Sequence, residues 1–240
     1  NKEKERSMST QWINISNEGD KEFSGYLALP PKGTGPGLIL LQEIWGVNDH
    51  IKAVAEQYAM SGFVVMAPDV FWRFDKQIAL NYDEQGNEKA FGYLNDLDKD
   101  QAVKDLTLAV DKLKSLPEVT GKVGVMGYCM GGLLAFRTAA ATDLDAAVCY
   151  YGGGIADFID EAADIHNPIL FHHGVKDQLI PEEAREAIRH HFAVRKDAVL
   201  YDYDADHGFN CWGRPAMYDQ PSATIAQGRT LEFLGQFLSE

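Results

Sequence analysis

Three residues with the chemistry of a nucleophile, an acid and a base follow three successive predicted strands. Cys129 lies in the segment GYCMGG, Asp177 in GVKD and His207 in DHGF. A thiol with an ordinary pKa of about 8.5 is only slightly ionised at neutral pH, so it needs a base. An imidazole can take that proton and return it to a leaving group, while a carboxylate holds the imidazole in one tautomer. We therefore predict a catalytic triad of Cys129, His207 and Asp177.

The glycines around Cys129 favour a catalytic turn. The pattern glycine-x-nucleophile-x-glycine is typical of a tight strand-to-helix turn, where a side chain at either flanking position would clash. Such a turn aims the N–H of the next residue, Met130, at a developing oxyanion, and the following helix N-terminus favours a thiolate. The alternatives are a buried structural cysteine, a turn or capping role for Asp177, and an exposed loop position for His207.

Apolar strands that alternate with amphipathic helices are predicted to position these residues. A leading hairpin is predicted from 12–16 and 23–29 with its turn at 18–20, and further strands at 37–42, 63–67, 122–127, 146–151, 169–173 and 198–203. Helices are predicted from Asn48 or Asp49 onward and at 102–116, 129–140, 181–192 and 222–238. This alternation predicts an α/β fold, a mostly parallel sheet with helices on both faces. The order nucleophile, acid, base is the one used in the α/β-hydrolase fold.

A fourth candidate, Glu43, lies in the segment QEIWG directly after the predicted strand 37–42. In this fold that loop supplies the second oxyanion donor, which we expect to be the N–H of Ile44. A carboxylate beside the oxyanion opposes the charge that must develop there. It makes sense if Glu43 is displaced on substrate binding or first accepts the thiol proton. The alternative is a surface carboxylate or an ion-pair partner.

Composition and charge exclude several classes of partner. The chain of 240 residues has 22 basic and 36 acidic side chains, a net charge of −14 at pH 7. An acidic protein gains nothing from neutralising phosphates, so we expect no nucleic acid partner and no membrane partner. The longest apolar runs, at 37–41 and 63–67, are far too short to cross a bilayer. Three cysteines without a disulfide pattern indicate a reducing compartment, and we expect the cytoplasm.

Nothing in the sequence divides the chain, so we expect a single domain over residues 1–240. Residues 1–8 are interpreted as a disordered or non-native lead, and residues 70–97 as an irregular excursion over the site. No His, Cys and carboxylate groups have metal-ligand spacing, since Cys149 lies in a strand and Cys211 in a loop. The glycines at 152–154 lack the Lys-Ser/Thr of a phosphate loop. We therefore expect no metal and no cofactor.

These motifs together resemble the dienelactone hydrolase family. The resemblance covers about 25–238 and rests on QEIWGVN at 42–48, APD at 67–69, YYG at 150–152, and the three triad segments. It implies a monomeric, cofactor-free lactone hydrolase whose thiol rests neutral until the glutamate activates it. Carried over by position, the catalytic roles fall on Cys129, His207, Asp177 and Glu43, and the oxyanion N–H groups on Ile44 and Met130.

The sequence departs from that family where a substrate carboxylate would be held. An arginine expected four residues after the catalytic histidine is replaced by Cys211, and a second arginine and a tyrosine fall near Asn87 and Phe91. Losing a bidentate guanidinium weakens carboxylate recognition. Candidate replacements are Arg214, Lys89 and Arg73. Arg214 either turns inward and rebuilds the clamp, which we favour, or faces solvent and leaves a pocket for neutral substrates.

The sequence therefore predicts an enzyme, a hydrolase of small lactones or activated esters that works through an acyl-thioenzyme. We expect Trp45, Tyr151, Arg214 and Phe91 to contact the small-molecule substrate. The alternatives are a general carboxylesterase or thioesterase, and a ligand-binding protein on a hydrolase scaffold.

Overall fold

The computed structural model describes residues 7–239, so most of the expected lead at 1–8 lies outside the described residues. Eight strands form one sheet in the order β1-β2-β4-β3-β5-β6-β7-β8. The strands are β1 Ser9–Glu18, β2 Lys21–Leu29, β3 Gly35–Leu41, β4 Val64–Pro68, β5 Val119–Tyr128, β6 Ala146–Tyr150, β7 Ile169–Gly174 and β8 Ala198–Tyr203. The helices are α1 Asp49–Met60, α2 Glu84–Asp96, α3 Lys99–Ser115, α4 Met130–Ala141, α5 Glu182–Phe192 and α6 Gln220–Leu238, with a 3₁₀ segment η1 Ile155–Asp164.

The sheet is parallel except at one edge. β1 and β2 form the predicted hairpin, and β2 pairs antiparallel with β4. All other neighbours are parallel, from β4–β3 through to β7–β8. The carboxyl ends of β3, β5, β7 and β8 therefore lie along one edge of the sheet, and the loops that follow them meet there. This arrangement confirms the predicted fold class.

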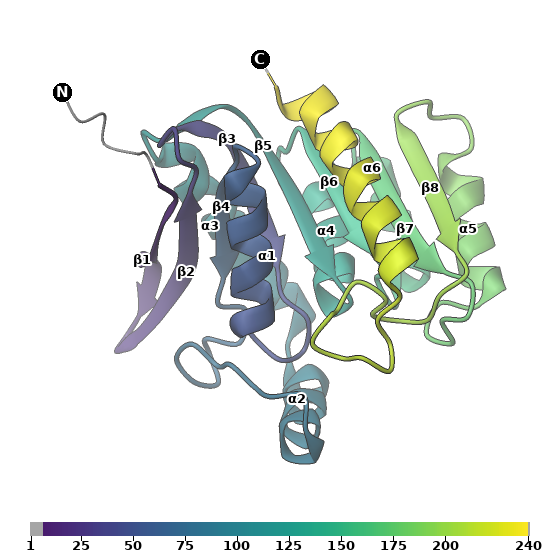
Figure 1. Ribbon diagram of the computed structural model, residues 1–240, viewed down its shortest axis with the longest axis horizontal. Coiled ribbons are helices and arrows are strands. Elements are labelled where there is room, and N and C mark those ends of the chain that lie inside the picture. Colours follow the sequence, from purple (N-terminus) through teal and green to yellow (C-terminus); the bar gives the residue numbers. More distant parts are fainter. Residues whose placement is uncertain (1–6, 240) are drawn as a thin grey trace.

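Helices cover both faces of the sheet (Figure 1). α1 and α6 lie on one face, where Ile51, Val54 and Phe233 join a buried cluster with alternate side chains of the strands. α3, α4 and α5 lie on the other face, where Leu106 and Phe136 belong to a second buried cluster. The side chains of β3, β4, β6 and β7 thus meet one of two apolar layers, which is why these strands are nearly continuous apolar runs in the sequence.

Most predicted elements are confirmed, but α2 and η1 were not predicted. α2 begins where the Asp83 side chain accepts a hydrogen bond from the N–H of Gly86, and it buries only Gly86 and Ala90. Gly86 and Gly92 both lie within this short helix, and glycine is a poor helix former, so the segment gives a weak helix signal in the sequence. It projects from the carboxyl edge of the sheet (Figure 1).

The segment 70–97, interpreted from the sequence as irregular, contains the helix α2 and packs on the loop that follows β3. The N–H of Leu80 donates to the carbonyl oxygen of Trp45 at 2.9 Å, and the Asn48 amide donates to the Tyr82 hydroxyl at 3.0 Å. Gly46 has a φ of +80°, and a Cβ there would lie 1.9 Å from the carbonyl oxygen of Ile78. Only glycine allows this approach, so the segment fixes the loop that carries Glu43.

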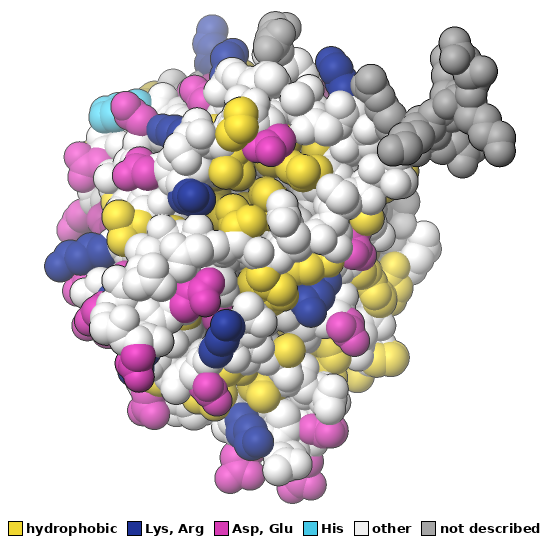
Figure 2. Space-filling model, turned by 90° about the vertical axis from the view of Figure 1, so that its left-hand side faces the viewer, with side chains coloured by type: hydrophobic (Ala, Val, Ile, Leu, Met, Phe, Trp, Pro, Cys, Tyr) yellow, Lys and Arg dark blue, Asp and Glu magenta, His cyan; other side chains and the backbone are white. Residues whose placement is uncertain are grey.

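The surface on the side of β1 and β2 carries side chains of both charges. Figure 2 shows acidic and basic side chains interspersed there with apolar ones, and no continuous basic patch. Within residues 7–239, no helix has both the length and the apolar character needed to span a bilayer.

Candidate active site

Cys129 lies on a strained turn between β5 and α4. Its φ of 60° and ψ of −121° are rare for a residue with a side chain, and such strain is stored where a rigid surrounding imposes it. A Cβ at Gly127 would lie 2.0 Å from the Gly131 carbonyl oxygen, and a Cβ at Gly131 would lie 2.3 Å from that of Leu41. Both glycines are therefore required for the turn, as the sequence pattern predicted.

The structure brings Cys129, His207 and Asp177 together. Nε2 of His207 lies 3.0 Å from Sγ of Cys129, and Nδ1 of the same ring lies 2.7 Å from Oδ2 of Asp177. The second oxygen of Asp177 accepts a hydrogen bond from the N–H of Leu179 at 2.9 Å. Asp177 is buried and Cys129 is half-buried. One imidazole thus joins a fixed carboxylate to an accessible sulfur, which is the geometry that proton transfer from a nucleophile requires.

The protonation of His207 reflects two opposing influences. Burial alone would lower the pKa of this imidazole, but the Cys129 sulfur and the Asp177 carboxylate act in the opposite direction and raise the pKa to about 10. The ring therefore holds a proton at neutral pH. The neutral resting thiol that the resemblance implies stays a prediction.

Two loops that could supply oxyanion N–H groups lie against each other. Met130 is the first residue of α4, and Ile44 follows β3; both are buried. A Cβ on Gly131 would lie 2.3 Å from the carbonyl oxygen of Leu41 and 2.5 Å from that of Gln42. The end of β3 therefore abuts the turn at Cys129.

Glu43 is not a surface carboxylate. It is 1% exposed, and its Oε1 accepts a hydrogen bond from the Tyr82 hydroxyl at 3.2 Å. Burial raises the pKa of Glu43, while the nearby Arg214 guanidinium, Tyr82 and Cys211 lower it in part. Burial therefore excludes the interpretation of Glu43 as a surface carboxylate. Two interpretations remain, an electrostatic partner of Arg214 and a functional role in catalysis.

The residues expected to contact substrate differ in their placement. Arg214 turns inward, with its guanidinium carbon 4.6 Å from the ring centroid of Trp45. The Tyr151 ring is buried 5.2 Å from that of His207, between centroids. Phe91 lies on α2 and is 55% exposed, so its role stays a prediction.

The other two candidate cations are less suited to replace the missing arginine. Arg73 forms a two-pronged ion pair with Asp105 and also contacts Glu18. Lys89 is exposed on α2. Arg214 is therefore the candidate cation that the structure places beside Glu43 and Trp45.

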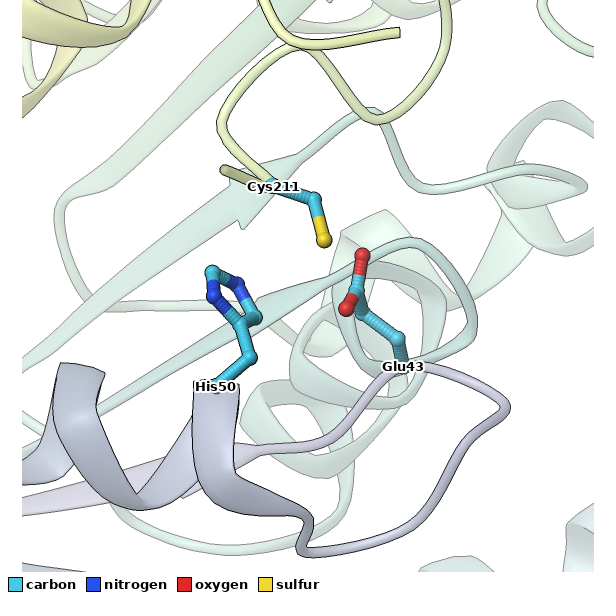
Figure 3. Close-up of side chains that lie close together, drawn as sticks. All are labelled: Glu43, His50 and Cys211. Carbon is cyan, nitrogen blue, oxygen red and sulfur yellow. The ribbon is translucent and has the colours of Figure 1, made fainter. Parts of the chain in front are cut away.

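Folding also assembles a group that sequence spacing did not predict. Glu43, His50 and Cys211 place one ligand atom each within 4.8 Å of one another (Figure 3). They come from the loop after β3, the first turn of α1 and the loop before α6. Because 161 residues separate His50 from Cys211, no spacing rule along the chain could find them.

Comparisons with known proteins agree with this geometry. Residues 23–238 match the model of the dienelactone hydrolase family. Carboxymethylenebutenolidase 1 of Cupriavidus pinatubonensis is 34% identical over 228 residues, which cover 95% of this chain and 97% of the relative. A carboxymethylenebutenolidase of a Pseudomonas species is 35% identical over 228 residues, 95% of each chain. A proposed dienelactone hydrolase from Klebsiella pneumoniae has a crystal structure with a TM-score of 0.82, 27% identity, and coverage of 96% of this chain and 99% of that one.

The sheet order, the covering helices and the turn at Cys129 define an α/β-hydrolase. Within that class, the chain belongs to the dienelactone hydrolase family. It is a hydrolase that acts on ester or lactone bonds of small molecules, so the ligand-binding alternative is set aside.

Proposed function

We propose that this enzyme hydrolyses small lactones or activated esters through an acyl-thioenzyme formed on Cys129. The observation that carries the proposal is the chain of contacts from the Cys129 sulfur through His207 to Asp177, at 3.0 and 2.7 Å. The position of the nucleophile holds a cysteine rather than a serine, and sulfur is a strong nucleophile once its proton is removed.

The proposed reaction has two halves. Sγ of Cys129 attacks the carbonyl carbon, and the tetrahedral oxyanion accepts hydrogen bonds from the N–H groups of Ile44 and Met130. Collapse breaks the ring C–O bond, and the leaving oxygen takes the Nε2 proton of His207, which leaves a thioester. Water then gives its proton to Nε2 while its oxygen bonds to the acyl carbon. The C–S bond breaks, the acid leaves, and the sulfur and imidazolium are restored.

Asp177 and Glu43 act on this cycle in different ways. Asp177 keeps Nδ1 of His207 protonated and holds the ring in place, so Nε2 faces the sulfur throughout. We propose that Glu43, buried beside Arg214 and Tyr82, controls the charge near Cys129 as substrate binds. A substrate carboxylate would pair with Arg214 in place of Glu43, and the face of Trp45 would pack against its apolar part.

The nucleophile is tested by exchange of Cys129 for alanine. We expect Cys129→Ala to fold normally and to lose hydrolysis of an activated aryl ester, because the glycines rather than the sulfur set the turn. Mass spectrometry of the wild-type enzyme with a slow ester should locate the acyl group on Cys129. The matched control is Cys149→Ala, at a buried thiol in β6. Turnover by Cys129→Ala, or acylation of another cysteine, would refute the proposal.

Substrate class is tested with a panel of lactones and open-chain esters or thioesters of equal acyl size. We expect lactones to have the higher kcat/KM. A preference for the open-chain compounds would favour a general carboxylesterase or thioesterase.

We further propose that the enzyme is a monomer of one domain that works in the cytoplasm. All three cysteines are free, which agrees with a reducing compartment. Light scattering should give the mass of one chain, and heat or urea should unfold it in a single cooperative transition.

A further inference from the structure

Three side chains of different chemistry converge beside the triad without forming part of it. Glu43, His50 and Cys211 are 1%, 6% and 0% exposed, and their ligand atoms lie within 4.8 Å of one another. Figure 3 shows the three side chains pointing toward a common centre. Asn48 caps α1 and thereby fixes His50 in its first turn, and the N–H of Cys211 donates to the carbonyl oxygen of Gly208 at 2.9 Å.

His50 is the observation that points to a ligand. Its Nδ1 is buried and has no hydrogen-bond partner among the described residues. A buried polar group without a partner is costly, and such groups are rare in folded proteins. A neutral imidazole is the form that binds a metal ion.

The donor set suits a divalent ion of intermediate softness. One nitrogen, one sulfur and one carboxylate oxygen are the three ligand types found at zinc sites. Metal–ligand bonds of about 2.0–2.3 Å in a tetrahedron place ligand atoms roughly 3.4–3.8 Å apart. The ligand atoms, which lie within 4.8 Å of one another, need to approach each other by about 1.4 Å at most, which side-chain rotations can supply. Three protein ligands leave a fourth position open.

A cavity opens beside His50, one of the three proposed ligands. A cavity of about 460 Å³ is lined by His50, Tyr82 and Trp212 among other residues, and the rings of His50 and Trp212 lie 4.2 Å apart between centroids. The cavity borders the cluster on the side of the segment 79–82. None of the three triad residues lines this cavity.

We propose that Glu43, His50 and Cys211 form a binding site for Zn²⁺, and that occupancy of this site inhibits the hydrolase. Binding replaces the thiol proton of Cys211, and any proton on Glu43, with bonds to the ion, and these protons pass to solvent. The ion also displaces Arg214 and Tyr82 as the partners of Glu43. The inhibitory part rests on the proposed function of Glu43, whereas the binding part does not.

Binding is tested with the Cys129→Ala protein, which keeps the cluster but lacks the triad sulfur. Co²⁺ is the probe, because a bound thiolate gives it an intense charge-transfer absorption that Zn²⁺ then abolishes by displacement. We expect this band in wild type and in Cys129→Ala. The band should be lost in Cys211→Ser. His50→Gln should weaken Zn²⁺ binding by more than about 100-fold, because substitution of residues that only support a metal ligand already lowers metal affinity by about 10–100-fold.

Two further variants sharpen the result. His191→Gln alters an exposed histidine on α5 and should bind Zn²⁺ as wild type does. Arg214→Ala removes the cation that competes for Glu43 and should bind Zn²⁺ more tightly. Circular dichroism establishes that each variant is folded, and Cys211→Ala serves if Cys211→Ser is not.

The proposal is overturned if the band is absent from wild type, or if it survives Cys211→Ser and disappears in Cys129→Ala. The second result would place the ion on the triad. Because binding is measured without turnover, failure of the proposed acyl-thioenzyme leaves this test intact. Zn²⁺ that binds as described but leaves wild-type hydrolysis unchanged would overturn the inhibitory part alone.

Discussion

At Glu43, burial and a nearby cation act against each other. Burial raises the pKa of this carboxyl, and Arg214 lowers it in part, so loss of the Arg214 contact favours the neutral form of Glu43. We expect Glu43→Gln to reduce kcat by about 10²-fold, roughly 2.7 kcal/mol in the barrier, because a neutral amide cannot adjust the charge near Cys129 as substrate binds. The control is Glu183→Gln, which removes an exposed carboxylate of α5. Wild-type turnover in Glu43→Gln would leave Glu43 with a purely structural role.

Arg214 is the residue expected to make the enzyme prefer a substrate that carries a carboxylate. Its guanidinium lies over Trp45, in the position to meet a carboxylate that displaces Glu43. With a pair of substrates that differ only in a carboxylate or its methyl ester, Arg214→Ala should lose about 2–5 kcal/mol of binding free energy on the charged member. The ester should change little. Equal losses on both substrates would mean that Arg214 orders the site without recognising charge.

At the scale of elements, the contact between the end of β3 and the start of α4 holds the proposed oxyanion loops together. A methyl group at Gly131 would lie 2.3 and 2.5 Å from the carbonyl oxygens of Leu41 and Gln42, and neither backbone group can rotate away. We expect Gly131→Ala to lower the free energy of unfolding by about 1–3 kcal/mol and to abolish turnover.

A helical glycine with free space around it provides the matched control for that substitution. Gly235 in α6 has nothing within 4 Å of an added Cβ. Gly235→Ala should raise the free energy of unfolding by up to about 1 kcal/mol and leave turnover unchanged. Urea unfolding and ester hydrolysis measure both effects. An active, stable Gly131→Ala protein would contradict the required close approach.

The elements also show what a sequence can predict. The triad was predictable because Cys129, Asp177 and His207 each follow a strand with a clear apolar pattern, and parallel strands bring their carboxyl ends to one edge. The helix α2 was not, because Gly86 and Gly92 weaken its helix signal. The approach of His50 to Cys211 depends on how the capped start of α1 faces the loop before α6, which no local pattern encodes.

Over the whole molecule, buried titratable groups set how stability depends on pH. His50, His172 and His173 are buried, and burial lowers the pKa of each. Unfolding exposes them, so the unfolded chain binds more protons as pH falls below about 6.5, and acid destabilises the fold. Asp69 acts in the opposite sense. Burial raises the pKa of Asp69 to about 7, and the folded state therefore binds its proton first and gains stability as pH falls.

His173 allows one of these contributions to be isolated. Neither ring nitrogen has a hydrogen-bond partner among the described residues, and burial lowers the pKa of His173 to about 4. A folded pKa below the unfolded value of about 6.5 gives stability that is present above pH 6.5 and lost as pH falls toward 4.

Between pH 7 and 4.5 this single group should therefore cost the wild type about 2–3 kcal/mol of unfolding free energy. His173→Gln has no such proton to gain. We measure the free energy of unfolding in urea at pH 7 and at pH 4.5 for both proteins. The loss between the two pH values should be about 2–3 kcal/mol smaller in His173→Gln than in wild type, as the pKa difference requires. His191→Gln, at an exposed position on α5, should follow the wild-type pH dependence. If His173→Gln and wild type lost stability in parallel, His173 would be charged in the folded protein near pH 5, and a water or a nearby carboxylate such as Asp202 would have to stabilise that charge.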